Sequence, residues 1–137
     1  AHMETYVNSV YRYHISYPDN QLIPQGESDS GDGQVFVSKD KLCELRVYRD
    51  TRDILYEGAI LRKSFREDID SFEKDSISNS ELTDSFYIIE GKNNNEIFHQ
   101  KTFLRKDNLL VTAVLSYKPE GSEIYKSLVA PIFDSMH

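Results

Sequence analysis

The fold of this chain is first decided by the stretch YRYHISYP, which spans Tyr11 to Pro18. Aromatic or aliphatic side chains at the odd positions, from Tyr11 to Tyr17, alternate with polar side chains at the even positions. Alternation with a period of two is typical of a β-strand that buries one of its two faces. Pro18 lacks a backbone N–H and restricts the residue before it, so it ends the run. The stretch therefore predicts the first strand.

The next part of the chain predicts a long loop and then a hairpin. Residues Asp19–Gln34 are rich in Gly, Ser, Asp and Pro and predict a surface loop, of a length that is often functional inside compact domains. Two strands follow, Val35–Val37 and Leu42–Tyr48, and the four polar residues between them suit a hairpin turn. In the second strand the apolar residues at odd positions share one face.

A helix is predicted after the hairpin. Its N-cap is Asp50, Thr51 or Asp53, whose side chains can accept bonds from the first free N–H groups, and it ends near Lys74. The apolar positions recur at the period of an amphipathic helix and are Ile54, Leu61, Phe65, Ile69 and Phe72. On the outer face basic residues precede acidic ones, an order that opposes the helix macrodipole. We interpret this face as solvated, with no role in helix stability.

The rest of the chain predicts an antiparallel meander and a final helix. Turn-forming residues separate four strands, which are Ser76–Leu82, Ser85–Glu90, Ile97–Leu104 and Leu109–Tyr117. The last strand is apolar on both faces, which is typical of a central strand covered twice. Beyond it, an apolar stripe with Pro131 inside it predicts a kinked helix. We therefore expect an α+β sandwich, in which an antiparallel sheet of six to seven strands is covered by two main helices.

Length and charge restrict the class of protein. A chain of 137 residues suits one domain with one core, which we place at residues 4–137 because the first three residues look like a remnant of a cloning site. A single cysteine excludes an internal disulfide framework. The net charge of −7 argues against a sequence-independent nucleic-acid binder, which needs clustered Lys and Arg, and favours a basic partner. No apolar stretch reaches the roughly 18 to 20 residues of a membrane span.

One local cluster of residues could bind something. Glu27, Asp29 and Asp32 lie close to two glycines, and carboxylates in a glycine-rich loop can ligate Ca²⁺ or contact a basic protein. The spacing does not fit the EF-hand template, so a solvated turn or a partner contact is favoured over a metal site. We predict no metal and no cofactor. The residues predicted to contact a partner are Glu27, Asp29, Asp32, Gln34 and Tyr48.

The residues that could carry catalysis are few and isolated. His14 and His99 lie on predicted strands, and sequence shows no further ligands at the spacing of a zinc or catalytic site. Cys43 shares an apolar strand face, where burial disfavours the reactive thiolate. The chain has no GxSxG elbow, P-loop or dinucleotide-binding motif. We therefore predict no catalytic residue and no enzyme activity.

Four pieces of sequence resemble the PsbP-like superfamily. The aromatic strand closed by Tyr17-Pro18 is similar to the opening strand of that superfamily. In its small bacterial envelope proteins a loop like Gly31-Asp32-Gly33-Gln34 and an aromatic strand, here Val35-Phe36-Val37, often follow. A strand with Leu45-Arg46-Val47-Tyr48, a helix, a meander and a terminal helix continue the same order over nearly the whole chain. Pro131 inside the final helix departs from the usual pattern.

The resemblance implies binding instead of catalysis, because most PsbP-like proteins are non-catalytic subunits, adaptors and envelope proteins. We expect a non-enzymatic protein-binding or accessory domain of the bacterial cell envelope, periplasmic or envelope-associated, with a cytoplasmic location left open. The first alternative is an immunity protein or adaptor chaperone that binds a secreted toxin or effector. The second is an enzyme built around His14 or His99. No functional residue of the superfamily transfers to a position of this chain, and the oligomeric state is left open.

Overall fold

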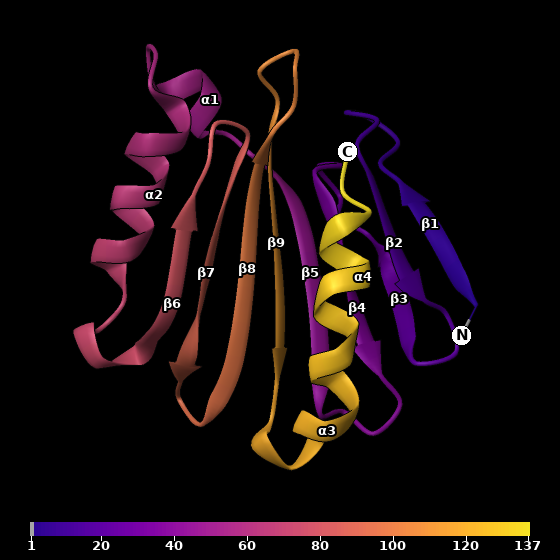
Figure 1. The fold of residues 1–137 in the computed structure, drawn as a ribbon. Coiled ribbons are helices and arrows are strands. Elements are labelled where there is room, and N and C mark those ends of the chain that lie inside the picture. The colour runs from indigo at the N-terminus through magenta and orange to yellow at the C-terminus, as the bar shows by residue number, and fades with distance from the viewer. Residues whose placement is uncertain (1) are drawn as a thin grey trace.

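A computed structural model describes residues 2–137 and contains one large antiparallel sheet (Figure 1). Its seven strands lie in the order β3-β4-β5-β9-β8-β7-β6. Their bounds are β3 Leu22–Glu27, β4 Gly33–Ser38, β5 Cys43–Asp50, β6 Ile77–Leu82, β7 Phe86–Asn93, β8 Glu96–Leu104 and β9 Leu110–Tyr117. The α+β fold with six to seven strands and the meander from β6 to β9 are therefore confirmed.

A separate two-stranded sheet packs against one face of the large sheet. It consists of β1 Met3–Val7 and β2 His14–Pro18, with Met3 paired to Pro18. The strand predicted from Tyr11 begins three residues later, because Arg12 has a positive φ of 62° and turns the chain. Met3, which the sequence assigned to a cloning remnant, contacts the core. Met3 is therefore part of the fold, and the origin of the first three residues stays a prediction.

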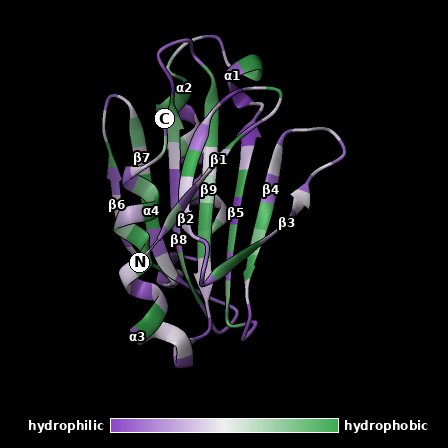
Figure 2. Cartoon of the chain, turned by 90° about the vertical axis from the view of Figure 1, so that its right-hand side faces the viewer, coloured by the Kyte–Doolittle hydropathy of each residue, from purple (hydrophilic) through white to green (hydrophobic). Residues whose placement is uncertain are grey.

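The first face of the large sheet, which the β1–β2 sheet covers, holds the larger core. Tyr13 and Ile15 pack there against Phe36 of β4 and Leu115 of β9. The helical C-terminal segment completes this layer, with Ile132 fully buried. Figure 2 shows the hydrophobic segments of β4 and β9 in green. β9 is the middle strand of the seven, as its apolar residues on both faces predicted.

The second face of the large sheet is covered by a helix over one half only. α1 Arg52–Leu55 and α2 Ile60–Ser71 lie beside β6 and β7, at the edge opposite to β3 (Figure 1). Leu61 of α2 packs there with Tyr87 and Phe98. The prediction of one continuous helix up to Lys74 is wrong, because the chain forms two helices, α1 and α2. Gly58 and Ala59 have φ values of 83° and 50°, and this left-handed pair separates two helices.

The prediction of a loop over Asp19–Gln34 is wrong for Leu22–Glu27, which form β3 at an edge of the sheet. Leu22 is fully buried and pairs with Ser38 of β4. Pro24 is tolerated because an edge strand needs hydrogen bonds on one side only. Gly26 has a φ of 98° in the irregular part of the ladder, between Pro24 and Glu27. Residues 28–32 form the remaining turn.

The C-terminal helix is interrupted, as Pro131 predicted. α3 Ser122–Tyr125 and α4 Val129–Asp134 are joined by a 3₁₀ turn at Lys126–Leu128. Pro131 has no N–H to offer the carbonyl four residues earlier, so the regular helical ladder cannot run through this point. Among residues 2–137, no helix has the length and apolar character needed to cross a membrane.

Candidate functional site

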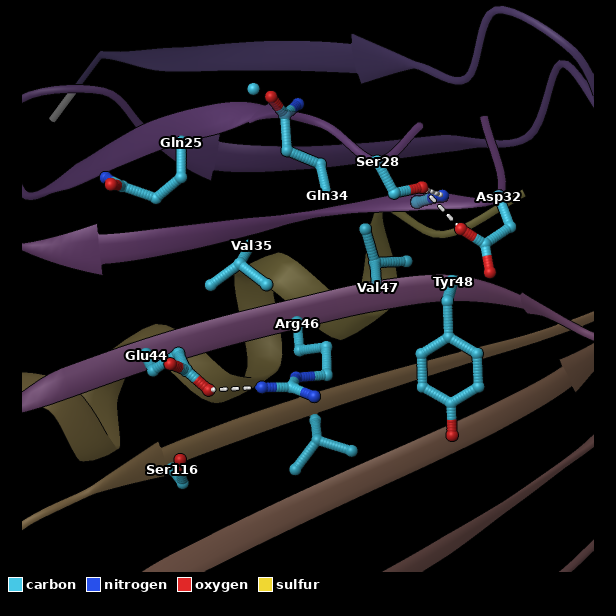
Figure 3. Close-up of a pocket in the computed structure, with 13 residues that line it drawn as sticks. Gln25, Ser28, Asp32, Gln34, Val35, Glu44, Arg46, Val47, Tyr48 and Ser116 are labelled. Atoms are coloured by element: carbon cyan, nitrogen blue, oxygen red, sulfur yellow. Dashed lines mark hydrogen bonds and ion pairs between the residues drawn. The ribbon is translucent and has the colours of Figure 1, made fainter. Parts of the chain in front are cut away.

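The uncovered half of the second face forms a groove of 780 Å³ over β3, β4, β5 and β9 (Figure 3). We call it the open groove. Its lining includes Gln25, Asp32, Val35, Arg46, Tyr48 and Val114. Two smaller hollows of 240 Å³ and 180 Å³ share Ser116 with it, and the larger of these reaches Phe72 just beyond α2. The hollowed surface therefore runs from the edge strand β3 to the end of the covering helix.

Strand alternation positions the groove side chains. On β5, Leu45 and Val47 point into the core of the first face, so Glu44, Arg46 and Tyr48 point to the second face. Val35 of β4 pairs with Arg46 and contributes an apolar, half-buried surface beside it. The groove therefore combines apolar patches with charged and amide groups, a composition typical of partner-binding surfaces.

Three charged side chains give the groove its electrostatic character. Arg46 donates to Glu44 at 3.3 Å, and both side chains are about half exposed, 56% and 43%. Asp32 at one end of the groove accepts hydrogen bonds from Ser28 and Ser30. The bond from Ser28 lowers the pKa of the Asp32 carboxyl against the opposing effect of burial, so this end carries a negative charge at neutral pH. The lining as a whole is slightly acidic.

The five predicted partner contacts do not form one cluster. Asp32, Gln34 and Tyr48 line the open groove, whereas Asp29 lies exposed at the tip of the β3–β4 turn. The Glu27 carboxylate faces the β1–β2 connection instead. Its partners there are the hydroxyl of Tyr6 at 2.7 Å, the hydroxyl and N–H of Ser9 at 2.7 Å and 3.0 Å, and the amide of Asn8 at 3.0 Å. Glu27 thus ties β3 to the smaller sheet.

Sequence reasoning missed Val35, Glu44, Arg46 and Val114 as groove residues. They come from three strands, and the pairing of β5 with β4 and β9 brings them together. A local signal existed, because the even positions of β5 are polar or aromatic while Cys43, Leu45 and Val47 are apolar. That signal identifies a face that is not packed like the other, but it does not identify which strands lie beside it.

The residues weighed for catalysis are engaged inside the fold. His99 is buried and pairs its Nδ1 with Glu90 and its Nε2 with the hydroxyl of Tyr117 at 2.9 Å. Burial raises the pKa of the Cys43 thiol to about 12, so the thiolate is rare at neutral pH. His14 lies next to His137, with ring centroids 4.4 Å apart.

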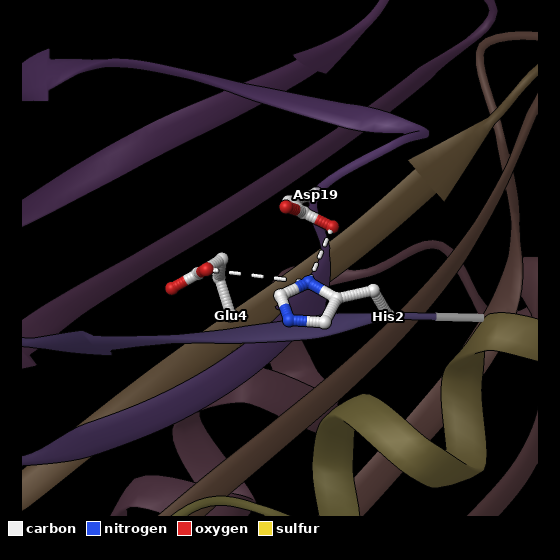
Figure 4. Close-up of side chains that lie close together, drawn as sticks. All are labelled: His2, Glu4 and Asp19. Atoms are coloured by element: carbon white, nitrogen blue, oxygen red, sulfur yellow. Dashed lines mark hydrogen bonds and ion pairs between the residues drawn. The ribbon is translucent and has the colours of Figure 1, made fainter.

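A histidine with two carboxylates lies on the smaller sheet (Figure 4). The Nδ1 of His2 is 3.1 Å from Asp19 and 4.0 Å from Glu4. The hydrogen bond to Asp19 raises the pKa of His2, as expected for an ion pair. All three side chains are exposed, and we interpret the group as a surface ion pair.

A buried ionic network, also missed from the sequence, fastens the two helices to the covered half. The Arg52 guanidinium donates to Asp50 at 2.8 Å, to Asp68 at 2.7 Å and to Glu67 at 3.0 Å. The hydroxyl of Tyr87 also donates to Asp68. Arg52 side-chain exposure is only 14%, so the partners compensate a charge that water barely reaches. Sixteen positions separate Arg52 from Asp68, which explains why no local pattern revealed the network.

No protein-family model matches this chain, and no curated protein matches its sequence. Among solved structures, the solution structure of cyanobacterial PsbP (CyanoP) from Synechocystis sp. PCC 6803 is similar, with a TM-score of 0.63 and 18% sequence identity. The match covers 98% of this chain and 91% of that one. The chain has a PsbP-like fold. The resemblance read from the aromatic first strand is thereby confirmed for the architecture, while identity at this level carries no statement about function.

Proposed function

We propose that this PsbP-like domain is a non-enzymatic accessory protein that binds a protein partner through the open groove. The observation that carries the proposal is the half-covered second face. α2 seals the β6–β8 half, whereas the β3–β5 half exposes a hollow of 780 Å³ with half-buried Val35 and Tyr48. Half-buried apolar and aromatic side chains in a concave surface gain from being covered by another protein.

Two further observations support binding over catalysis. The imidazole of His99 has both nitrogens occupied, and the thiol of Cys43 is buried with a raised pKa. The proposed partner is basic, because the protein carries a net charge of −7 and the groove contributes Asp32 and Glu44. Opposite charges accelerate the encounter of two proteins, and salt screens that effect.

The envelope location that the sequence resemblance implies is part of this proposal. Fractionation of the source cells, with detection by an antibody against this chain, tests the location. Recovery in the cytoplasmic fraction would contradict the envelope location and leave the proposal of binding in the groove unaffected. Nothing in the groove specifically supports the alternative function as an immunity protein or adaptor chaperone. That alternative stays a prediction from the sequence.

The test of partner binding is capture from a lysate of the source organism by three immobilised proteins. These are the wild type, the groove variant Val35→Lys, and Ser78→Lys on the exposed outer strand β6 as a control with the same added charge. We expect one stoichiometric partner on the wild type and the control, lost with Val35→Lys and weakened at high salt. A partner retained equally by all three proteins would contradict the groove.

A further inference from the structure

Two consecutive apolar side chains protrude from the end of the molecule where α1 lies. Ile54 and Leu55 are 72% and 71% exposed, more than any other large hydrophobic residue within residues 2–137. Figure 1 shows α1 at one end of the fold, before the start of α2. Single exposed apolar residues are ordinary, whereas an adjacent pair at this exposure on a helix is a marked surface feature.

The fold itself holds this pair in the solvent. On the N-terminal side Arg52 is fixed by the buried network, and Asp53 by separate contacts. The Asp53 carboxylate accepts from Arg49 at 2.7 Å and from the N–H of Leu110 at 2.8 Å. α1 is therefore anchored on one side to the sheet, and its other side presents Ile54 and Leu55. Ile54 and Leu55 are therefore exposed because the anchored helix presents them to solvent, and not because the end of a helix is frayed.

Three cations follow the apolar pair on α2, two in its first turns and one at its middle. Arg62, Lys63 and Arg66 are exposed, and none of them makes an ion pair with a residue in the range 2–137. The first turn of α2 has no acidic residue, so Arg62 and Lys63 near its N-terminus oppose the helix macrodipole. Between residues 54 and 66 the one acidic residue is Glu57.

One of the cations, Lys63, lies close to the segment that carries the apolar pair. The ammonium of Lys63 is 5.6 Å from the centre of the Tyr56 ring, and Tyr56 directly follows Leu55. The α1–α2 tip, which we define as residues 54–66, thus joins protruding aliphatic side chains, a tyrosine and three cations. It is locally basic in a protein whose net charge is −7.

We propose that the α1–α2 tip binds an anionic lipid surface. Ile54 and Leu55 would enter the boundary between headgroups and acyl chains, while Arg62, Lys63 and Arg66 contact lipid phosphates. Ile54 and Leu55 protrude, whereas residues 58–62 of the same tip line a hollow of 580 Å³. Protruding aliphatic side chains can enter a deformable lipid surface without a matching hollow. The acidic remainder of the molecule is repelled by the same surface, which orients the tip toward it. The tip is separate from the open groove, so either proposal can fail alone.

The first test is co-sedimentation of the protein with vesicles. One set contains about half phosphatidylglycerol in phosphatidylcholine and the other phosphatidylcholine alone, at about 20 mM and about 0.5 M salt. We expect sedimentation with the anionic vesicles at low salt only. The double variants Ile54→Asp/Leu55→Asp and Arg62→Glu/Lys63→Glu should each lower the partition coefficient at least about tenfold. Lys39→Glu/Lys41→Glu, in the β4–β5 turn, carries the same charge change and should have a small effect.

The absence of tryptophan allows a second test of the same tip. Ile54→Trp places one fluorophore on α1, and Ile124→Trp places one on α3 at a residue that is 51% exposed. We expect a blue shift on adding anionic vesicles for the first variant and none for the second. The proposal is overturned if the wild type does not sediment with anionic vesicles at low salt, or if both tryptophan variants respond alike. Capture of a soluble acidic protein by the tip without vesicle binding would equally overturn it.

Discussion

The two halves of the second sheet face differ in what covers them. Under α2, Tyr87 and Ile89 are fully buried and Arg52 is enclosed by three carboxylates. Over β4 and β5, Val35 is half-buried and Arg46 forms an exposed pair with Glu44. The same sheet face thus presents a packed half with an enclosed ionic network and an open half with a solvent-exposed ion pair. A partner-binding surface is therefore better sought in the open half.

The largest expected difference in stability is between two single arginine variants, one in each half of the face. Arg52→Met leaves Asp50 and Asp68 buried without their cation, so we expect the free energy of unfolding to fall by about 3 to 5 kcal/mol. Arg46→Met breaks an exposed pair and should cost less than about 1 kcal/mol. Urea unfolding followed by circular dichroism measures both. Equal losses in the two variants would remove the distinction between the halves.

A second pair of variants compares apolar packing. Leu61→Ala empties a site between α2 and the sheet, where Leu61 is 7% exposed, and should cost about 2 to 4 kcal/mol. Val35→Ala removes a side chain that water already reaches, so less than about 1 kcal/mol is expected. The same unfolding measurement applies. A Val35→Ala loss as large as that of Leu61→Ala would show that the open groove is part of the core.

The third prediction concerns pH and acts on the covered half. Burial alone would raise the pKa of Asp50, but hydrogen bonds and the charge of Arg52 lower it below its value in the unfolded chain. The unfolded state therefore takes up a proton first as pH falls, and this contribution to stability, complete at neutral pH, declines below about pH 4. Unfolding midpoints measured between about pH 7 and pH 3 should fall less steeply for Asp50→Asn. Parallel curves for the variant and the wild type would contradict this.

The smallest expected effect on stability is in the open half and separates folding from binding. Val35→Lys should change the free energy of unfolding by less than about 1 kcal/mol, because its side chain can reach water from the groove. The same variant should lose the partner. If Val35→Lys unfolds at a clearly lower urea concentration than Ser78→Lys, its loss of binding would no longer be evidence that the partner binds in the groove.

Periodicity along one strand predicted most of the fold, and contacts across strands explain what it missed. The β6–β9 meander and the central place of β9 followed from alternation and turn residues. β3 was missed because Pro24 and Gly26 are breakers in sequence but acceptable at a sheet edge. The helix break was missed because a single glycine such as Gly58 is tolerated inside a helical pattern, and the left-handed Ala59 beside it has no sequence signature.

The site was less predictable than the fold. Asp32 and Gln34 were proposed from the glycine-rich loop and Tyr48 as an exposed aromatic, and all three line the open groove, while their contact with a partner stays a prediction. Glu27 looked similar in sequence, but its carboxylate is used by Tyr6, Asn8 and Ser9. Only the register of β4 against β5 and β9 brings the remaining groove residues together.

The central claim is that the open half of the second face is where a partner binds. Its most direct test replaces Arg46 in the groove, or Glu81 on the outer strand β6, with a photo-crosslinking amino acid and irradiates the captured complex. We expect a covalent adduct with the partner from position 46 and none from position 81. An adduct from position 81 alone, or equal adducts from both positions, would contradict it.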